Sequence, residues 1–191
     1  MNARRDHEEN APQPFPAAWA WLLDNPIAVR HAGRIVQLLG IRPGMRVLDV
    51  GCGTGRLTLP VAELVGPSGE VVGLDLQSRM LDLLERRAAS RGLTNVRTLH
   101  AAAGRAGLRP GSFDRALLVS VLGEIPEAER GSALEEVAGA LGPGGLLAVA
   151  EGAPDPHRLS EEAVTALVQD AGLRPVRVDG VWLGFVLQAR R

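Results

Sequence analysis

The sequence has no lysine, no tyrosine and a single cysteine, Cys52. All 21 basic residues are therefore arginine, which excludes Schiff-base chemistry and the lysine of a P-loop. One cysteine cannot form an internal disulfide or a thiolate metal cluster, so we expect a reducing compartment and no metal site. With only 3% aromatic residues, an aromatic cage for methylated lysine or for flat rings is not expected.

An excess of one charge and long apolar runs are also missing. The chain has 22 acidic and 21 basic residues, so its bulk charge does not indicate a nucleic-acid partner. No apolar run approaches the roughly 20 residues that span a bilayer, and the charged first residues do not resemble a signal peptide. We therefore expect a soluble cytoplasmic protein without a membrane span. A chain of 191 residues suits one domain.

The N-terminal part of the chain predicts two short segments before that domain. Residues 1–16 are polar and rich in proline, which is typical of a flexible tail. Residues 17–40 have helical spacing, and we expect a helical lid whose Trp19 and Trp21 line an apolar acceptor pocket. The two tryptophans could equally dock this segment on the core or on a second subunit of a homodimer. The main domain is predicted at 41–191.

Strand and helix patterns alternate along this domain. The sequence predicts strands at 45–50, 71–76, 96–99, 113–120, 146–151, 174–179 and 182–189, and helices at 56–65, 78–91, 126–141 and 161–171. Ser78 and Ser160 are the expected N-caps of two of the helices. Five strands that alternate with helices predict a doubly wound α/β fold, mostly parallel, with helices on both faces of the sheet. The last two strands have only a very short turn at Gly180 between them, so they must pair antiparallel.

A glycine-rich loop follows the first predicted strand in the stretch "VLDVGCGTG". Gly51, Gly53 and Gly55 keep side chains out of the turn, so backbone amides at a helix N-terminus can face an anionic group of a ligand. Arg56 stands where the dinucleotide fingerprint requires another glycine. The glycines could alternatively serve only the geometry of the turn.

Two aspartates end the first two strands. Asp49 can receive a cationic amine, directly or through water, and its charge would repel a pyrophosphate. Asp75 can accept both hydroxyls of a ribose, a role that NAD sites share. Leu76 and Met80 offer apolar surface for an adenine ring. The alternative for both aspartates is that they only cap the strand ends.

Four stretches resemble, in order and spacing, the landmarks of class I S-adenosylmethionine (SAM)-dependent methyltransferases. They are "VLDVGCGTG", "VVGLDLQSRML", "FDRALLVSVLGEIP" and "LGPGGLLAVAE". The resemblance covers about residues 26–191, includes the terminal antiparallel hairpin, and is nearest to quinone- and arsenite-type methyltransferases. The arsenite branch needs several cysteines, and the motif and basic face usual in nucleic-acid methyltransferases are missing. The resemblance implies a seven-stranded Rossmann-like sheet, SAM as cofactor, S-adenosylhomocysteine (SAH) as product and a small-molecule methyl acceptor.

The resemblance also assigns the cofactor site residue by residue. The residues that it implies are Asp49, Gly51, Cys52, Gly53, Gly55, Asp75, Leu76, Met80, Ala102, Ala103 and Ser120. We expect Cys52 to be a packed residue of the loop rather than a nucleophile. The family usually has an aspartate for the adenine amino group where "LHAAAG" places Ala102. The adenine must then rely on backbone groups near 101–103, which could weaken cofactor affinity about 10-fold or more.

Catalytic residues are harder to assign. Methyl transfer from a sulfonium is an in-line displacement, which a dry, aligning pocket can promote without a general base. The candidates for a base are Glu124, Glu151 and His157, at the ends of the fourth and fifth strands or in the loop that follows. Glu124 could instead serve a local salt bridge, and His157 could be a solvated loop residue. Relatives often have a histidine where this chain has Gly123.

Three functions are compatible with these observations. The first is an active SAM-dependent methyltransferase that acts on a small molecule, which we favour. The second is a SAM- or SAH-binding regulatory or partner-dependent protein that has lost independent catalysis, which Ala102 and Gly123 favour slightly. The third is an NAD-dependent oxidoreductase, which Arg56, Asp49 and the antiparallel end of the sheet disfavour.

Overall fold

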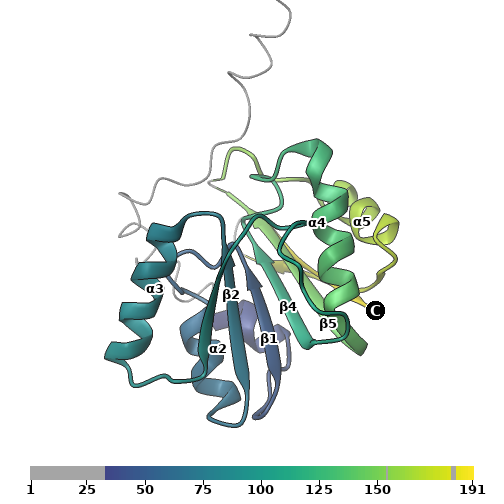
Figure 1. Cartoon of the computed structure of the whole chain (residues 1–191). Helices are drawn as coiled ribbons and strands as arrows, with labels where there is room; N and C mark the ends of the chain where they lie inside the picture. The colour runs from purple at the N-terminus through teal and green to yellow at the C-terminus, as the bar shows by residue number, and fades with distance from the viewer. Residues whose placement is uncertain (1–32, 154, 182–183) are drawn as a thin grey trace, which may run out of the picture.

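A computed structural model describes residues 33–153, 155–181 and 184–191 of the chain. The described residues form a seven-stranded sheet with the strand order β3-β2-β1-β4-β5-β7-β6 (Figure 1). Strand β7 runs antiparallel to its neighbours β5 and β6, and the other neighbouring strands of the described sheet pair in parallel. The strands are β1 (Arg46–Val50), β2 (Glu70–Asp75), β3 (Val96–His100), β4 (Phe113–Val119), β5 (Leu141–Gly152), β6 (Arg174–Val181) and β7 (Gly184–Arg190).

Helices cover both faces of this sheet, as the alternation of elements predicts. One face packs against a short helix at residues 33–38 and against α2 (Thr58–Val65), with α3 (Ser78–Ser90) beside α2. The other face packs against α4 (Glu127–Ala140) and α5 (Glu161–Asp170). The predicted doubly wound α/β fold is confirmed.

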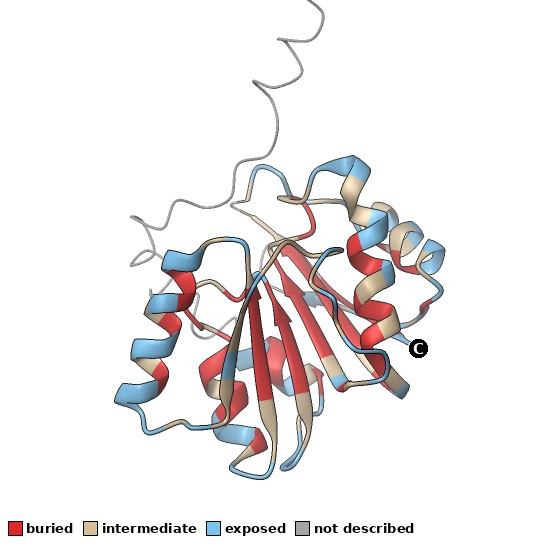
Figure 2. Ribbon diagram, viewed as in Figure 1, coloured by how far each residue is buried: buried red, intermediate tan, exposed pale blue. Residues whose placement is uncertain are grey.

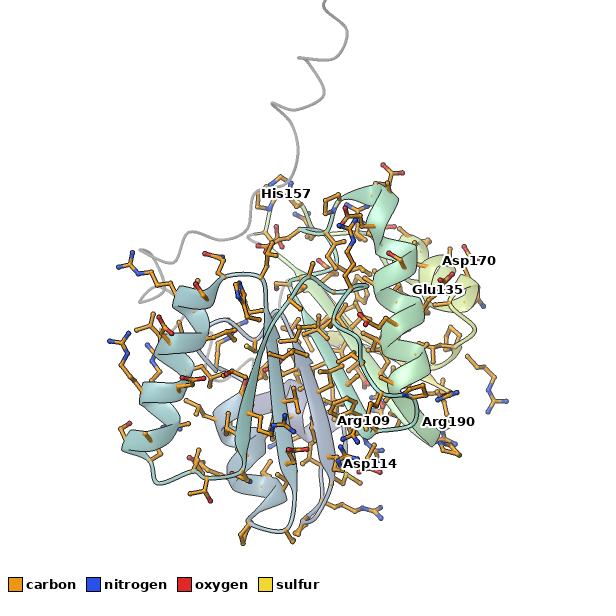
Figure 3. All side chains as sticks on the ribbon, in the orientation of Figure 1. Arg109, Asp114, Glu135, His157, Asp170 and Arg190 are labelled. Atoms are coloured by element: carbon orange, nitrogen blue, oxygen red, sulfur yellow. The ribbon has the colours of Figure 1, made fainter. Side chains whose placement is uncertain are left out.

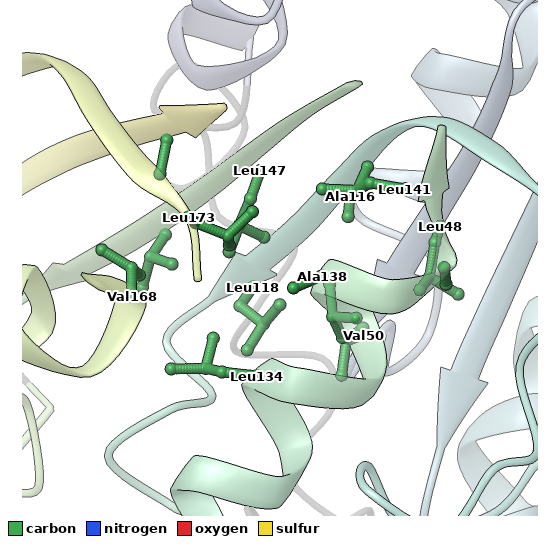
Figure 4. Close-up of a cluster of buried hydrophobic side chains, with 14 of the residues drawn as sticks. Leu48, Val50, Ala116, Leu118, Leu134, Ala138, Leu141, Leu147, Val168 and Leu173 are labelled. Atoms are coloured by element: carbon green, nitrogen blue, oxygen red, sulfur yellow. The ribbon is translucent and has the colours of Figure 1, made fainter. Parts of the chain in front are cut away.

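Apolar side chains alternate between the two faces of the central strands. In β4, Leu117 belongs to the cluster under α2, whereas Leu118 belongs to the cluster under α4 and α5. Figure 4 shows the latter cluster, which includes Leu134 of α4, Leu173 and Leu147 of β5. The central strands are buried and the exposed residues lie on the outer sides of the helices (Figure 2). This two-sided burial fixes the strand ends, and therefore the residues that follow them, in space.

Several expected boundaries are wrong in detail. The hairpin does not turn at Gly180, which lies within β6 and pairs with Phe185. The N-cap of α3 is Gln77 rather than Ser78, and no side chain caps that helix. Strand β5 begins at Leu141, directly after α4, because Leu141 already pairs with Phe113 of β4; the register then shifts, and regular pairing resumes at Leu146. By contrast, the Ser160 side chain accepts a hydrogen bond from the Ala163 amide, which confirms the predicted cap of α5.

The predictions for the N-terminal segment fall largely outside the described residues. These are the tail at 1–16 and most of the lid at 17–40, including Trp19 and Trp21. Within the described part, Ile35 and Leu39 are buried against the sheet with α2. The lid therefore stays a prediction. None of the described helices is long and apolar enough to cross a membrane.

Candidate cofactor and acceptor site

The candidate site begins where β1 and β4 lie side by side. The chain leaves β1 toward β2 on one side and leaves β4 toward β5 on the other, and ligands of open α/β sheets bind at such a switch point, beyond the carboxyl ends of the strands. The turn after β1 is fixed to the neighbouring strand: the amides of Gly51 and Cys52 both donate to the Leu74 carbonyl oxygen, at 2.7 and 3.1 Å. The glycine loop therefore has a defined position at this edge.

The three glycines of this loop serve different structural roles. All three have positive φ, between 52° and 90°. A Cβ on Gly51 would overlap the Val121 side chain, and one on Gly55 would overlap Leu84. A Cβ on Gly53 would meet no atom within 4 Å, so the space beside this residue is open. Gly51 and Gly55 are thus required by packing, and Gly53 presents bare backbone that a ligand can approach.

Asp75 joins the turn after β1 to the turn after β2. One of its carboxylate oxygens accepts the Gly53 amide at 2.8 Å, and the other accepts the Gln77 amide at 2.8 Å. Each carboxylate oxygen can accept more than one hydrogen bond, so lone pairs are left for hydroxyl donors. The arrangement holds the carboxylate beside the open backbone of Gly53.

Asp49 lies under the same loop, with only 2% of its surface exposed. The Thr58 hydroxyl donates a 2.6 Å hydrogen bond to its carboxylate. Burial raises the pKa of Asp49 to about 6, although the Thr58 bond and the Arg56 charge act in the opposite direction. A cationic partner would stabilise the charged form of this buried carboxylate, because it would replace the favourable interaction with water that burial removes.

The remaining apolar residues of the expected cofactor site differ in exposure. Cys52 is buried against Leu84, and Gly73 of β2 makes room for its sulfur, which would lie 2.9 Å from a Cβ there. Burial raises the pKa of the Cys52 thiol far above its usual range, which makes a nucleophilic thiolate unfavourable. Leu76 is 58% exposed, whereas Met80 is buried. Leu76 is therefore the one that leaves apolar surface uncovered.

Ser120 has a backbone conformation that the sequence does not reveal. Its φ is 55°, the only positive value at a non-glycine residue in the described part of the chain. It follows β4, and its amide donates to the Ala150 carbonyl oxygen at 2.9 Å. Non-glycine residues in this region are strained and concentrate at functional sites, so the strain marks the β4 end of the same edge.

Glu151 lies at the end of β5 with 2% of its surface exposed. One carboxylate oxygen accepts the Gly123 amide at 3.3 Å, and the other has no hydrogen-bond partner among the described residues. Burial raises the pKa of Glu151 to about 7, and the nearby Asp155 charge adds to this effect. A buried acceptor without a partner is uncommon and suggests a group that the bare chain does not supply.

The loop after β5 covers Glu151. The backbone of this loop packs so closely on Gly123 that a Cβ there would overlap the His157 carbonyl oxygen. The His157 side chain is exposed, and Figure 3 shows it at the end of the sheet opposite to Arg109 and Arg190. Glu124 is half-buried in the loop after β4. Of the three predicted catalytic residues, only Glu151 is deeply buried.

Two residues that organise the edge were not predicted. Arg130 of α4 donates to the carbonyl oxygens of Leu122, Gly123 and Ile125, at 2.9 to 3.2 Å. Glu136, also on α4, accepts hydrogen bonds from backbone amides of the loop after β3. Arg130 bonds to a loop that directly precedes its own helix, whereas Glu136 bonds to a segment about 30 residues away. Both bind backbone groups, which every residue has, so these contacts leave no pattern in the sequence. Among the described residues, no group of three or more His, Cys, Asp or Glu side chains could hold a metal ion.

Comparison with known proteins identifies the family. A family model described as "Methyltransferase domain" matches residues 47–145, just over half of the chain. The chain therefore belongs to the methyltransferase domain family, and its fold is that of the class I SAM-dependent methyltransferases. This match decides against the oxidoreductase interpretation.

Individual relatives agree with this assignment. A demethylmenaquinone methyltransferase of Staphylococcus aureus (strain JH9) is 35% identical over 118 residues, which are 62% of this chain and 47% of that protein. The chain thus spans about half the length of the curated relatives that it matches. A SAM-dependent methyltransferase from Aquifex aeolicus has a TM-score of 0.83 at 27% identity, over 92% of this chain and 98% of that one.

Another solved structure with the same fold is the cyclase SpnF. It has a TM-score of 0.76 at 20% identity, and the compared region covers 86% of this chain and 80% of the SpnF chain. At this identity the likeness shows the fold alone. Since one fold can support different reactions, the function has to be argued from the site.

Proposed function

We propose that this chain binds SAM at the glycine loop and transfers its methyl group to a small-molecule acceptor. The observation that carries the proposal is the open backbone of Gly53, whose amide bonds to Asp75, in the loop that directly follows the buried carboxylate of Asp49. The chemistry of these groups fits the cofactor: a carboxylate suits the ammonium of the methionine part, and another suits the ribose hydroxyls. Neither carboxylate suits a pyrophosphate.

The adenine end of SAM is proposed to contact backbone rather than an acidic side chain. Among the hydrogen bonds of the described residues, none uses the amides of Ala102 or Ala103. The Ala101 amide, by contrast, donates to the Asp75 carbonyl oxygen at 3.2 Å. The two unused donors can serve the ring nitrogens of the base. The exposed Leu76 offers apolar surface at the end of β2, which pairs with the end of β3. Backbone groups thus replace the missing acid at position 102.

SAM, when bound, supplies an electrophilic methyl group on a sulfonium. The protein's own contribution is alignment and the exclusion of water at the edge shared by β1, β4 and β5. For an acceptor that must lose a proton, we assign the free oxygen of Glu151 as the proton acceptor. The acceptor's bond to the methyl carbon would form as the methyl carbon–sulfur bond breaks, which would leave neutral SAH. Glu151 would take the proton that the acceptor loses. A pKa of about 7 leaves this carboxylate part ionised at neutral pH, as a general base requires.

The proposed acceptor is an apolar small molecule. The sequence relative from Staphylococcus aureus is named as a methyltransferase of demethylmenaquinone, which belongs to this class. The accepting atom is left open between carbon, nitrogen, oxygen and sulfur. A cytoplasmic location and a homodimer formed through the N-terminal segment are further parts of the proposal that come from the sequence.

A second candidate function is cofactor binding without independent turnover. Ala102 favours it, because the adenine has no charged partner there. The buried Glu151 favours the enzyme instead. Both candidates require the same cofactor site, so turnover separates them and binding does not.

Calorimetric titration with SAM and with SAH tests the cofactor site. We expect micromolar binding in the wild type and a loss of at least about 10-fold in Asp75→Ala, since the ribose loses its acceptor. Asp82→Ala is the matched control, because Asp82 is an exposed aspartate on the neighbouring helix α3. If neither SAM nor SAH binds to the wild type, the proposal is wrong. Equal affinities in the two variants would place the nucleoside elsewhere.

A further inference from the structure

Glu136 of helix α4 holds the backbone of the loop after β3 through its carboxylate. Glu136 accepts the Gly104 amide at 2.8 Å and the Ala106 amide at 3.2 Å on one oxygen. Its other oxygen accepts the Leu108 amide at 3.2 Å. A single side chain thus holds three backbone donors of a segment about 30 residues away in sequence.

Side chains also hold this loop, because Ala106 and Leu108 pack against the core and Arg105 pairs with Glu129 of α4. Residues 101–112 contain no helix or strand, and Gly104 and Gly107 both have positive φ. Close packing adds to the three hydrogen bonds at one point, because a Cβ on Gly104 would lie 2.9 Å from the Ser132 hydroxyl of α4. Backbone groups of a loop are placed only as well as their anchors allow, and here the main polar anchor is Glu136.

The anchored segment follows directly on the two unused amides of Ala102 and Ala103. We propose that Glu136 is a positioning residue for the nucleoside end of the cofactor. It holds the loop so that these two amides read the adenine ring, a task that an acidic side chain at position 102 would otherwise share. This inference rests on the proposed function, since it requires a cofactor with an adenine base at this loop.

The chemistry of the base supplies a specific readout. Adenine has a lone pair on its ring nitrogen N1, whereas hypoxanthine has an N–H there. A backbone amide can therefore donate a hydrogen bond to N1 of adenine but not to N1 of hypoxanthine. The test is to measure the Kd of SAH and of S-inosylhomocysteine by calorimetry. We expect the wild type to prefer SAH by about 10-fold or more, and Glu136→Ala to reduce this preference toward 1. Glu136→Gln keeps one acceptor oxygen, so its preference for SAH should lie between those of the wild type and Glu136→Ala.

Glu135 offers a matched control on the same helix. It is the adjacent residue, exposed on α4 (Figure 3), so Glu135→Ala and Glu135→Gln make the same changes in charge and size without touching the loop. General loss of folding would weaken both ligands alike and leave their ratio unchanged. If Glu136→Ala does not fold, Glu136→Gln decides.

The possible results separate this inference from the proposed function. A wild type that binds neither ligand contradicts the proposed function. A wild type that binds both equally, or a preference that survives in both Glu136 variants, overturns the role of Glu136 and leaves the cofactor site intact. A reduced preference in the Glu136 variants, with the Glu135 variants like the wild type, supports the inference.

Discussion

Glu151 shows at the scale of one residue how burial is linked to stability. Its pKa of about 7 in the folded chain lies above the ordinary value of 4.5, because burial disfavours the charged form. Below pH 4.5 the group is protonated in both states and has no effect. As the pH rises from 4.5 to 7, the unfolded chain releases this proton first, so the free energy of unfolding falls.

We therefore predict that Glu151→Gln removes part of this fall in the free energy of unfolding at higher pH. Relative to the wild type, the variant should gain about 1–3 kcal/mol in free energy of unfolding between pH 4.5 and pH 8. Urea denaturation at several pH values measures the difference. The same variant should lose methyl transfer to a proton-bearing acceptor while its affinity for SAM is kept, because we propose Glu151 as the base for the acceptor and not as a cofactor ligand.

Glu135→Gln is the control, since Glu135 is exposed and its removal should leave the pH dependence as in the wild type. A Glu151→Gln curve parallel to that of the wild type would show that the carboxylate titrates normally in the folded protein. In that case Glu151 is not the buried acceptor that the proposed mechanism uses.

Two loops meet at the scale of elements, where the segment after β4 packs under the segment after β5. Gly123 is the contact point, because a Cβ there would overlap the His157 carbonyl oxygen. Arg130 fixes the same segment from α4 through three carbonyl oxygens. The packing of the two loops near Glu151 thus depends on Gly123, which has no side chain, and on Arg130 of α4, which holds the loop that contains Gly123.

We predict that Gly123→Ala destabilises the fold by about 1–3 kcal/mol, because the added methyl forces the two loops apart. The matched control is Gly131→Ala. Gly131 lies in α4, where an added Cβ meets no atom within 4 Å, so this change should stabilise the protein by about 0.5–1 kcal/mol. Thermal or urea unfolding of the two variants gives the comparison. If Gly123→Ala raised the free energy of unfolding as Gly131→Ala does, the two loops would accommodate the added methyl group without cost, and the prediction would be wrong.

Cofactor binding and folding are linked at the scale of the whole molecule, because the site exists only where β1, β2 and β4 are assembled. Binding to the folded state alone stabilises it by about 2.7 kcal/mol at a ligand concentration 100 times the Kd. For a chain of this length, that corresponds to a rise in Tm of about 5–11 °C. We predict this rise for SAM and SAH and none for NAD, measured by differential scanning calorimetry. A rise with NAD as large as that with SAM would contradict the carboxylate-based argument for selectivity.

Much of this fold could be predicted because its information is local. Apolar runs and helical spacing identified the seven strands and the helices, and the short link before β7 required antiparallel pairing. Boundaries are harder to read from local patterns: Ser78 has the right chemistry for a cap, but Gln77 occupies the position. Asp49 and Asp75 were predicted as site residues because each stands at the end of a strand, and their roles in cofactor binding stay predictions.

The sequence by itself determined the α/β class, the glycine loop and the two carboxylates at its sides. Only the tertiary structure decided that Thr58 donates to Asp49, that an oxygen of Glu151 lacks a partner, and that Arg130 and Glu136 hold the loops at this edge. The physical reason is that these side chains bond to backbone groups or lose water through burial. Every residue has the same backbone, and burial depends on the assembled chain, so neither leaves a local pattern in the sequence.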